Sequence, residues 1–193
     1  MKDPCIRQLL KNTKLAKYFR DGSSRVVEEM NLPVAKARVD IAVINGHLHG
    51  YEIKSASDTL SRLPGQIEAY TKVFDYLSVI TEDKYAGKVA AIVPQWVGIY
   101  TCSAASGRLT RIRQEKINRH KEGFYLAKLL WREEIEAVLN ENNIAYRKKD
   151  RNWILCELLA REIKTSELSA IVRGKLKNRT SWREPSTEGC VSA

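Results

Sequence analysis

The sequence predicts an α/β protein, in which a central mixed β-sheet is flanked by helices and a smaller helical region follows. Three observations support this class. Residues 38–54 have the pattern of two strands joined by a tight turn, a helix and several short apolar runs come next, and apolar residues recur at helical spacing from about residue 123. We therefore expect a core at residues 1–122, a helical subdomain at 123–180 and a polar tail at 181–193 without assigned structure.

The remaining elements follow from periodicity and from turn residues. Leucines and aromatic residues at helical intervals predict a helix at residues 6–19, and a Pro predicts that another helix begins near Pro64. Short apolar runs between turn signals predict strands at residues 76–81, 88–94, 98–103 and 109–113. Helical period predicts three further helices at 124–143, 152–163 and 166–179, whose apolar stripes, together with Trp131 and Trp153, are expected in the core.

The hairpin at residues 38–54 carries a polar group at a distinctive place. Side chains alternate between the two faces of a strand, so Asp40, Glu52 and Lys54 leave the face that holds the apolar residues. If residues 45–47 form a three-residue loop, Asp40 stands directly opposite Glu52. Two carboxylates would then face each other across the sheet.

Facing carboxylates are destabilising unless a cation compensates them or one pKa rises. Magnesium or manganese would serve, because both prefer hard oxygen ligands, and Lys54 would place a positive charge near a phosphate or an attacking hydroxide. This is chemistry suited to phosphodiester hydrolysis. The alternative is a solvated strand face on which the same residues form exposed ion pairs.

Two further polar elements accompany the hairpin. Gln66 and Tyr70 are spaced i,i+4 on the helix near Pro64 and share one of its faces. Upstream, Glu29 fits the spacing of a strand and offers a third carboxylate, although Glu28 or an ordinary surface acid is the alternative.

The ordered set of Glu29, Asp40, Glu52-Ile53-Lys54 and Gln66-x3-Tyr70 resembles the PD-(D/E)XK nuclease superfamily over about residues 25–80. The Gln-x3-Tyr element is similar to the RecB-like branch, and the run YEIKSASDTLSRLPGQIEAYTKVFD is similar to a small bacterial and phage family of this type. The resemblance implies a restriction-endonuclease-like fold. Val39 stands where the superfamily name has Pro, which is a common departure.

The resemblance also implies roles for these side chains. Asp40 and Glu52 would bind Mg²⁺ or Mn²⁺ together with the backbone carbonyl of Ile53, with Glu29 as a further ligand. Lys54 would orient the attacking water and offset the developing charge. Gln66 and Tyr70 would contact the substrate strand or brace the site.

Composition agrees with a nucleic-acid partner. The net charge of +10 indicates a polyanion such as DNA, or alternatively RNA, since bound lysines and arginines release counterions from phosphates. The four cysteines are scattered without a C-x2-C pair, so neither zinc nor an iron–sulfur cluster is indicated, and free thiols in a reducing cytoplasm are expected. No apolar run has membrane-spanning length, so no membrane partner is expected.

Other polar groups have two interpretations each. Arg173, Lys175 and Lys177 on the last helix either grip DNA or form a solvated basic face. Arg62 either meets a phosphate or pairs with Asp58 or Glu68. His47-x-His49 lacks a third nearby ligand and is interpreted as an exposed turn, not a metal site.

The sequence therefore predicts a metal-dependent deoxyribonuclease. The alternatives are a nucleic-acid-binding module that kept the fold without catalysis, and a nuclease that acts on RNA. The sequence leaves open endonuclease or exonuclease action, the preferred DNA structure, whether the chain forms a homodimer, and whether it serves repair, restriction or phage–host conflict.

Overall fold

The computed structural model describes residues 3–55, 59–103 and 107–180, and within them the chain forms a six-stranded mixed sheet in the order β1-β2-β3-β4-β5-β6. The first three strands are antiparallel, β3, β4 and β5 are parallel, and β6 is antiparallel to β5. The strands are β1 Arg25–Asn31, β2 Arg38–Ile44, β3 Leu48–Lys54, β4 Tyr76–Glu82, β5 Gly98–Cys102 and β6 Leu109–Arg113.

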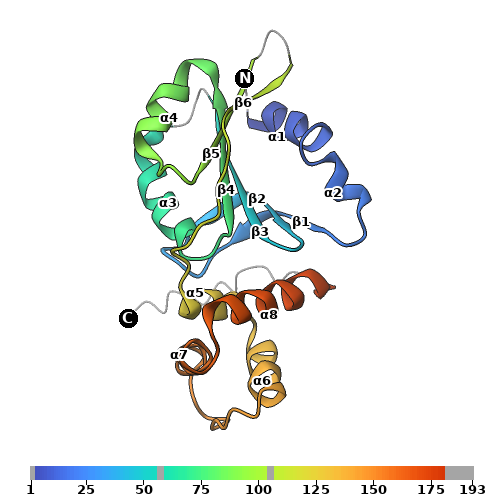
Figure 1. The fold of residues 1–193 in the computed structure, drawn as a ribbon, viewed down its shortest axis with the longest axis vertical. Helices are drawn as coiled ribbons and strands as arrows, with labels where there is room; N and C mark the ends of the chain where they lie inside the picture. The colour runs from blue at the N-terminus through green and yellow to red at the C-terminus, as the bar shows by residue number, and fades with distance from the viewer. Residues whose placement is uncertain (1–2, 56–58, 104–106, 181–193) are drawn as a thin grey trace, which may run out of the picture.

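Helices cover the sheet on both faces, and the C-terminal helices pack at one end (Figure 1). On one face lie α3 and α4, and on the other α1 and α2. The helices are α1 Asp3–Asn12, α2 Ala16–Arg20, η1 Leu60–Arg62, α3 Leu63–Thr71, η2 Asp83–Tyr85, α4 Ala86–Ile92, α5 Gly123–Ala127, α6 Arg132–Glu141, α7 Asn152–Glu162 and α8 Thr165–Asn178. The predicted α/β class, with a mixed sheet, flanking helices and a C-terminal helical region, is confirmed.

Three predicted elements are wrong. The predicted helix at 124–143 is interrupted at residues 128–131 and forms the separate helices α5 and α6. Residues 88–94 were expected to form a strand, but they belong mostly to helix α4. Val89 is the only buried residue within α4. A short apolar run does not by itself distinguish a helix with one buried position from a strand. The predicted helix at 6–19 is broken at residues 13–15, where the Thr13 hydroxyl bonds back to the Leu9 carbonyl and Leu15 turns fully into the core.

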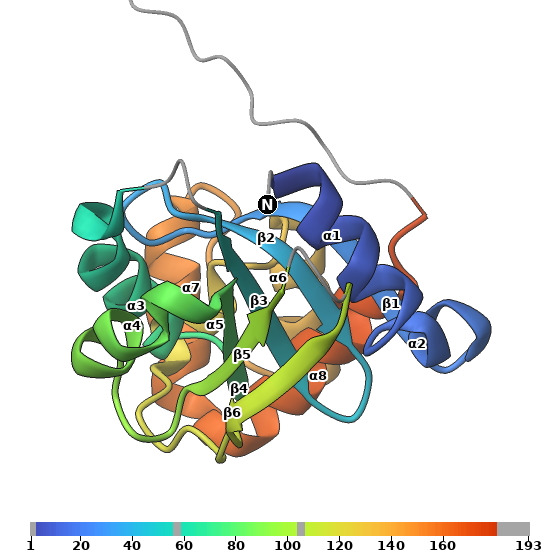
Figure 2. The ribbon, with the colours of Figure 1, turned by 90° about the horizontal axis from the view of Figure 1, so that it is seen from above.

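The hairpin has the predicted register. Ile41 pairs with Tyr51 and Ile44 with Leu48, which leaves residues 45–47 as the loop and carries Asp40 opposite Glu52 one step further along. On the predicted apolar face, Ile41, Val43, Tyr51 and Ile53 pack in one core cluster with residues of α1, whereas Val39, which strand alternation also puts on that face, belongs to the larger core cluster. Helix α1 contacts β3 and lies next to β2 in Figure 2. The opposite face is also buried, with Ala42 and Ile44 in the larger core cluster. The hairpin is therefore enclosed on both sides.

The larger core cluster joins the sheet to the C-terminal helices. It contains residues of β2 and α3 together with the predicted apolar stripes of the last four helices, which confirms those stripes as core. Buried Asp75 links the same regions, since it accepts a hydrogen bond from the Leu48 amide and pairs with Lys121 and with Arg173. The boundary predicted near residue 122 stays a prediction, and the predicted tail at 181–193 lies outside the described residues.

The tryptophans and His49 correct other expectations, whereas His47 is exposed in the hairpin loop as predicted. Trp153 is 48% exposed and not part of the core, while Trp131 is half-buried under the guanidinium of Arg179. His49 does not lie on an exposed turn. It is in β3, stacks on the ring of Tyr51 and bonds to the Ser78 hydroxyl at 3.0 Å, and its burial lowers the pKa of its imidazole to about 3.

None of the helices in the described part of the chain is both long and apolar enough to span a bilayer.

Candidate active site

The predicted site residues meet where β2 begins, β3 ends and α3 starts. A cavity of about 410 Å³ opens there, and its walls include Asp40, Glu52, Lys54 and Gln66. The sheet supplies the first three side chains, and the first turns of α3 supply the fourth. Pro64 at the start of α3 favours helix initiation at this point, which directs Gln66 and Tyr70 toward the end of β3.

Glu52 is the centre of a buried hydrogen-bond network. Its Oε1 atom accepts from Lys54 Nζ at 2.8 Å and from Gln66 Nε2 at 2.7 Å, and its Oε2 atom accepts from the Tyr70 hydroxyl at 2.7 Å. Gln66 Oε1 accepts a second bond from Lys54 Nζ at 2.8 Å. Glu52 and Lys54 are only 2% and 4% exposed, which excludes the solvated strand face.

Asp40 has a different environment from Glu52. Its Oδ2 accepts the backbone N–H of Ile53 at 2.7 Å, and its Oδ1 lies 3.1 Å from Arg7 Nη2. Burial, and secondarily the charge of Glu52, raise the pKa of the Asp40 carboxyl to about 7, although the Ile53 amide and Arg7 oppose the shift. Facing carboxylates require a compensating cation or a raised pKa, and this pair has both.

Arg7 on α1 is the site residue that sequence reasoning missed. Its guanidinium donates to the Asp40 backbone carbonyl at 2.9 Å, pairs with the Asp40 carboxylate and lies 2.7 Å from Glu29 Oε1. Its neighbour Ile6 is fully buried, so Arg7 sits at the margin of the apolar stripe of α1. No sequence spacing relates Arg7 to the hairpin. The one sequence signal for Arg7 was its position as a basic residue next to the apolar stripe of α1.

Glu29 lines the cavity, whereas Glu28 does not and pairs with Lys11 and, at 3.7 Å, with Arg7. The flanking pairs Glu28 with Ile41 and Met30 with Val39 place Glu29 opposite Asp40, so the three carboxylate-bearing positions fall in one row across β1, β2 and β3. Glu29 has φ 53°, a left-handed conformation that costs a non-glycine residue on the order of 1–3 kcal/mol. Its carboxylate is paired with Arg7 and, at 2.8 Å, with Arg38.

The donor set suits magnesium or manganese better than zinc. Within the described residues no group of three or more His, Cys, Asp or Glu side chains is arranged to hold a metal ion. Magnesium, however, is usually bound by one or two carboxylates and keeps several waters. Asp40, Glu52 and the Ile53 carbonyl match that requirement, because a carboxylate oxygen has a second lone pair for the ion. The guanidinium of Arg7 supplies a positive charge beside the Asp40 carboxylate, as a bound metal ion would.

The remaining predicted residues do not join this cluster closely. Arg62 is exposed at the cavity wall, and its alternative partner Asp58 lies outside the described residues. On α8, Arg173 is paired with Asp75 and Lys175 with Glu141 at 2.8 Å, and Lys177 is half-buried. None of these three helix residues lines the cavity.

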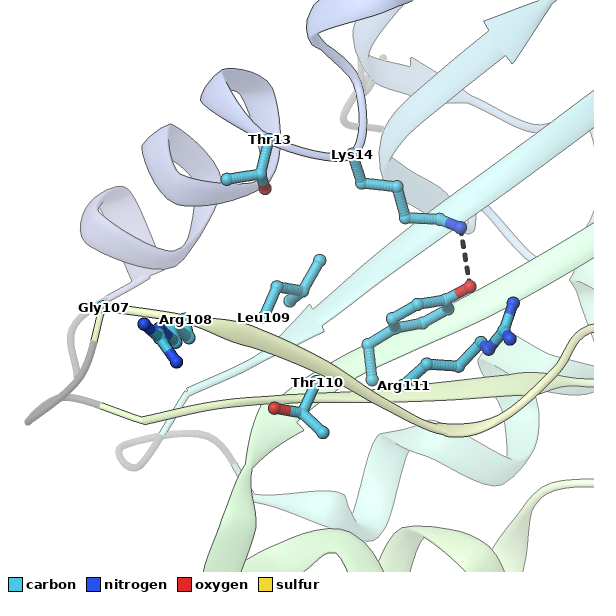
Figure 3. A pocket seen from close by; sticks show the side chains of 8 residues that line it. Thr13, Lys14, Gly107, Arg108, Leu109, Thr110 and Arg111 are labelled. Carbon is cyan, nitrogen blue, oxygen red and sulfur yellow. Dashed lines mark hydrogen bonds between the residues drawn. The ribbon is translucent and has the colours of Figure 1, made fainter.

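A larger cavity, of about 640 Å³, lies between the end of α1 and the β5–β6 pair. There Lys14 Nζ donates to the Tyr100 hydroxyl at 2.6 Å, and Tyr100 donates to Glu115 at 2.9 Å. Figure 3 shows the Lys14 side chain with a dashed line that marks its hydrogen bond. These polar groups satisfy one another. The smaller cavity is the better candidate site, because it gathers two carboxylates, a buried lysine and an amide.

The raised pKa of Asp40 gives a pH-dependent stability prediction. Because that pKa of about 7 exceeds the unfolded value of about 4, the unfolded chain loses this proton first, and metal-free stability falls as pH rises from about 4 to 7. Asp40→Asn removes this cost. We expect the variant to melt higher than wild type at pH 8, by about 2–4 °C per kcal/mol regained, with a smaller difference at pH 4.

Thermal melts in chelator at both pH values check this prediction, with exposed Asp83→Asn as the matched control that shows no such pH dependence. A melting difference for Asp40→Asn that is equal at pH 4 and pH 8 would contradict the raised pKa.

The fold and site define an α/β protein with a paired-carboxylate cavity at one end of its mixed sheet. The chain belongs to the family described as Bacteriophage P4 protein cII, whose model matches residues 2–186. It is 26% identical over 156 residues to Protein cII of Enterobacteria phage P4, covering 80% of this chain and 59% of that relative. The chain thus matches less than two thirds of the relative's length.

A solved protein of unknown function from Silicibacter pomeroyi is also similar, at 15% identity and a TM-score of 0.41. The similarity covers 70% of this chain and 92% of the other.

Proposed function

We propose that the protein is a metal-dependent nuclease of the PD-(D/E)XK type, which hydrolyses DNA phosphodiester bonds by attack of an activated water. The observation that carries the proposal is that half-buried Asp40 stands opposite buried Glu52, with Lys54 hydrogen-bonded to Glu52. Buried facing carboxylates cost stability. Groups that destabilise the fold in this way are concentrated at functional sites. The function that suits two facing carboxylates is the binding of a divalent cation through their oxygen atoms.

The residues divide the work according to their contacts. Asp40, Glu52 and the Ile53 carbonyl would hold Mg²⁺ or Mn²⁺, which supplies a Lewis acid and a water of lowered pKa. Lys54 holds a fixed positive charge beside Glu52, where it can orient water and offset charge developing on the phosphate. Gln66 and Tyr70 hold the Glu52 carboxylate in place from α3, so both position the site. Gln66 also lines the cavity and can face the substrate strand, whereas Tyr70 is buried behind it.

A non-catalytic binding module is the second candidate, and one observation favours it. Arg7 already pairs with Asp40 and Glu29, and every Glu52 oxygen already accepts protein hydrogen bonds, so the site is charge-compensated without a metal. Both candidates predict a nucleic-acid partner for this basic chain in the cytoplasm, and RNA is the alternative substrate within the enzyme class. They differ only in turnover.

A cleavage panel tests the proposal. Linear, circular, single-stranded and branched DNA, with an RNA strand alongside, are incubated with the protein in Mg²⁺, Mn²⁺, Ca²⁺ or EDTA. We expect cleavage in Mg²⁺ or Mn²⁺, little or none in Ca²⁺, and none in EDTA, since magnesium-type sites need the smaller octahedral ion. Cleavage at an undiminished rate in excess chelator would overturn the mechanism. Binding without cleavage in any metal would favour the binding module.

A further inference from the structure

We propose that the segment joining α6 to α7, together with the first turn of α7, is a surface that binds single-stranded nucleic acid. The surface consists of Arg147, Lys148, Lys149, Arg151 and Trp153, and we call it the connector surface. All five residues are exposed, and Trp153 keeps 48% of its surface in solvent. Figure 1 shows this connector at the end of the molecule opposite α1 and β6.

The connector cations are free to meet phosphates, unlike Arg173 and Lys175 of α8, which are paired with acids. Within the described part of the chain, the side chains of Lys148, Lys149 and Arg151 form no ion pair. Arg147 is 72% exposed and pairs with Asp150 alone. On α8, by contrast, Arg173 is held by the buried Asp75. A cation already paired with a buried acid gains little from a phosphate, whereas a solvated one releases a counterion.

The connector is held in one shape by Arg132 of α6. Its guanidinium donates to the Lys148 carbonyl at 2.7 Å and to the Asp150 carbonyl, and it also lies 3.1 Å from Asn152 Oδ1. A turn hydrogen bond from the Asp150 amide to the Arg147 carbonyl, at 2.9 Å, closes the segment. A charged side chain thus spends its donors on backbone carbonyls of an exposed loop. The connector cations are therefore preorganised, which lowers the conformational entropy that is lost on binding.

Trp153 indicates that the nucleic acid bound here is a single strand and not a duplex. It stands in the first turn of α7, two residues after Arg151, so an indole ring lies next to backbone-binding cations. Base stacking on an exposed aromatic ring contributes about 1–3 kcal/mol per base, and it requires a base that is not already stacked in a duplex. Cations that follow a backbone beside an aromatic platform are the combination by which proteins hold single strands. The positive N-terminal end of α7 adds to the same potential.

The connector surface deepens the proposed function, because it assigns a second grip for the substrate remote from the cavity. The connector surface depends on the proposed function only in that the bound strand is taken to be the substrate, because binding itself needs no turnover. Binding can therefore be measured in EDTA with uncut DNA.

The test is fluorescence anisotropy with a labelled 20-nucleotide single strand and the matching duplex, both in EDTA, over a series of salt concentrations. Two lost phosphate contacts lower the slope of log K against log salt by about 1.4, which is an affinity loss of roughly 25-fold at 0.1 M salt. We expect this loss for Lys148→Glu with Lys149→Glu. Lys84→Glu with Lys88→Glu, an equal charge change at exposed positions near α4, is the control and should fall less than about threefold.

Trp153 separates stacking from charge. Trp153→Ala should weaken single-strand binding by about 5-fold to 100-fold and duplex binding much less, while Trp153→Phe should recover most of the loss. Equal affinities of wild type and the Lys148 and Lys149 variant would overturn the connector surface even if the wild type cuts DNA. Binding that depends on these residues in a protein that never cuts would support the surface and overturn the nuclease. If Trp153→Ala weakens duplex binding and single-strand binding by the same factor, the assignment of a single strand as the ligand is wrong.

Discussion

Lys54→Ala is expected to lower the rate of DNA cleavage by about 100-fold or more, because one well-placed charge in an active site is worth that much or more. Lys54 is 4% exposed and donates to both Glu52 and Gln66, so its ammonium is fixed and not mobile in solvent. The acids that would hold the metal remain in the variant. The expected loss is therefore in turnover at saturating metal, whereas binding of uncut DNA in Ca²⁺ should weaken only about 5-fold to 8-fold at 0.1 M salt, as one phosphate contact is lost.

The controls separate this effect from misfolding. Removing Lys54 leaves a buried Glu52 that still accepts from Gln66 and Tyr70, so circular dichroism and thermal melting must show a folded protein before rates are compared. Lys72→Ala is the matched control, because Lys72 is a more exposed lysine at the end of α3 whose carboxylate contacts are long, at 3.9 Å. Its rate should stay within about twofold of wild type. A folded Lys54→Ala protein that cuts as fast as wild type would remove Lys54 from the site.

The hairpin and its polar set were predictable from sequence because they depend on local spacing. Strand alternation and a three-residue loop fix which residues lie opposite Asp40, and the i,i+4 spacing fixes that Gln66 and Tyr70 share a helical face. The structure places all of these side chains around one cavity, apart from Tyr70, which reaches Glu52 from behind it. Their catalytic roles stay predictions.

The parts that sequence did not predict depend on tertiary packing. Arg7 reaches Asp40 across 33 positions of sequence, and only the docking of α1 on the sheet brings them together. The run at residues 88–94 is mostly helical, with Val89 as the buried position of α4, and a short apolar run does not distinguish this from a strand. Likewise, charge alone did not separate Arg173, which a buried acid holds, from Lys148 and Lys149, which are exposed. Burial distinguishes structural cations from free ones.

Asp40→Asn should abolish metal-dependent cleavage, with a loss of about 100-fold or more, because a neutral amide replaces a charged ligand. The same substitution is expected to stabilise the metal-free protein at pH 8, since the pKa of Asp40 is raised to about 7 by its burial. Lost activity with retained or higher stability is the signature of a residue kept for binding a cation. Asp83→Asn, at an exposed position in η2, should change neither property.

Calorimetric titration of Mn²⁺ into wild type and Asp40→Asn, at pH 6 and pH 8, tests the metal site most directly. Wild type should bind Mn²⁺ about tenfold more weakly at pH 6 than at pH 8, because below a pKa of about 7 a proton competes for Asp40. Asp40→Asn should bind at least about 10-fold to 100-fold more weakly than wild type at pH 8 and lose most of the pH dependence. No Mn²⁺ binding by wild type, or equal affinity in the two proteins, would contradict a metal centre at Asp40 and Glu52.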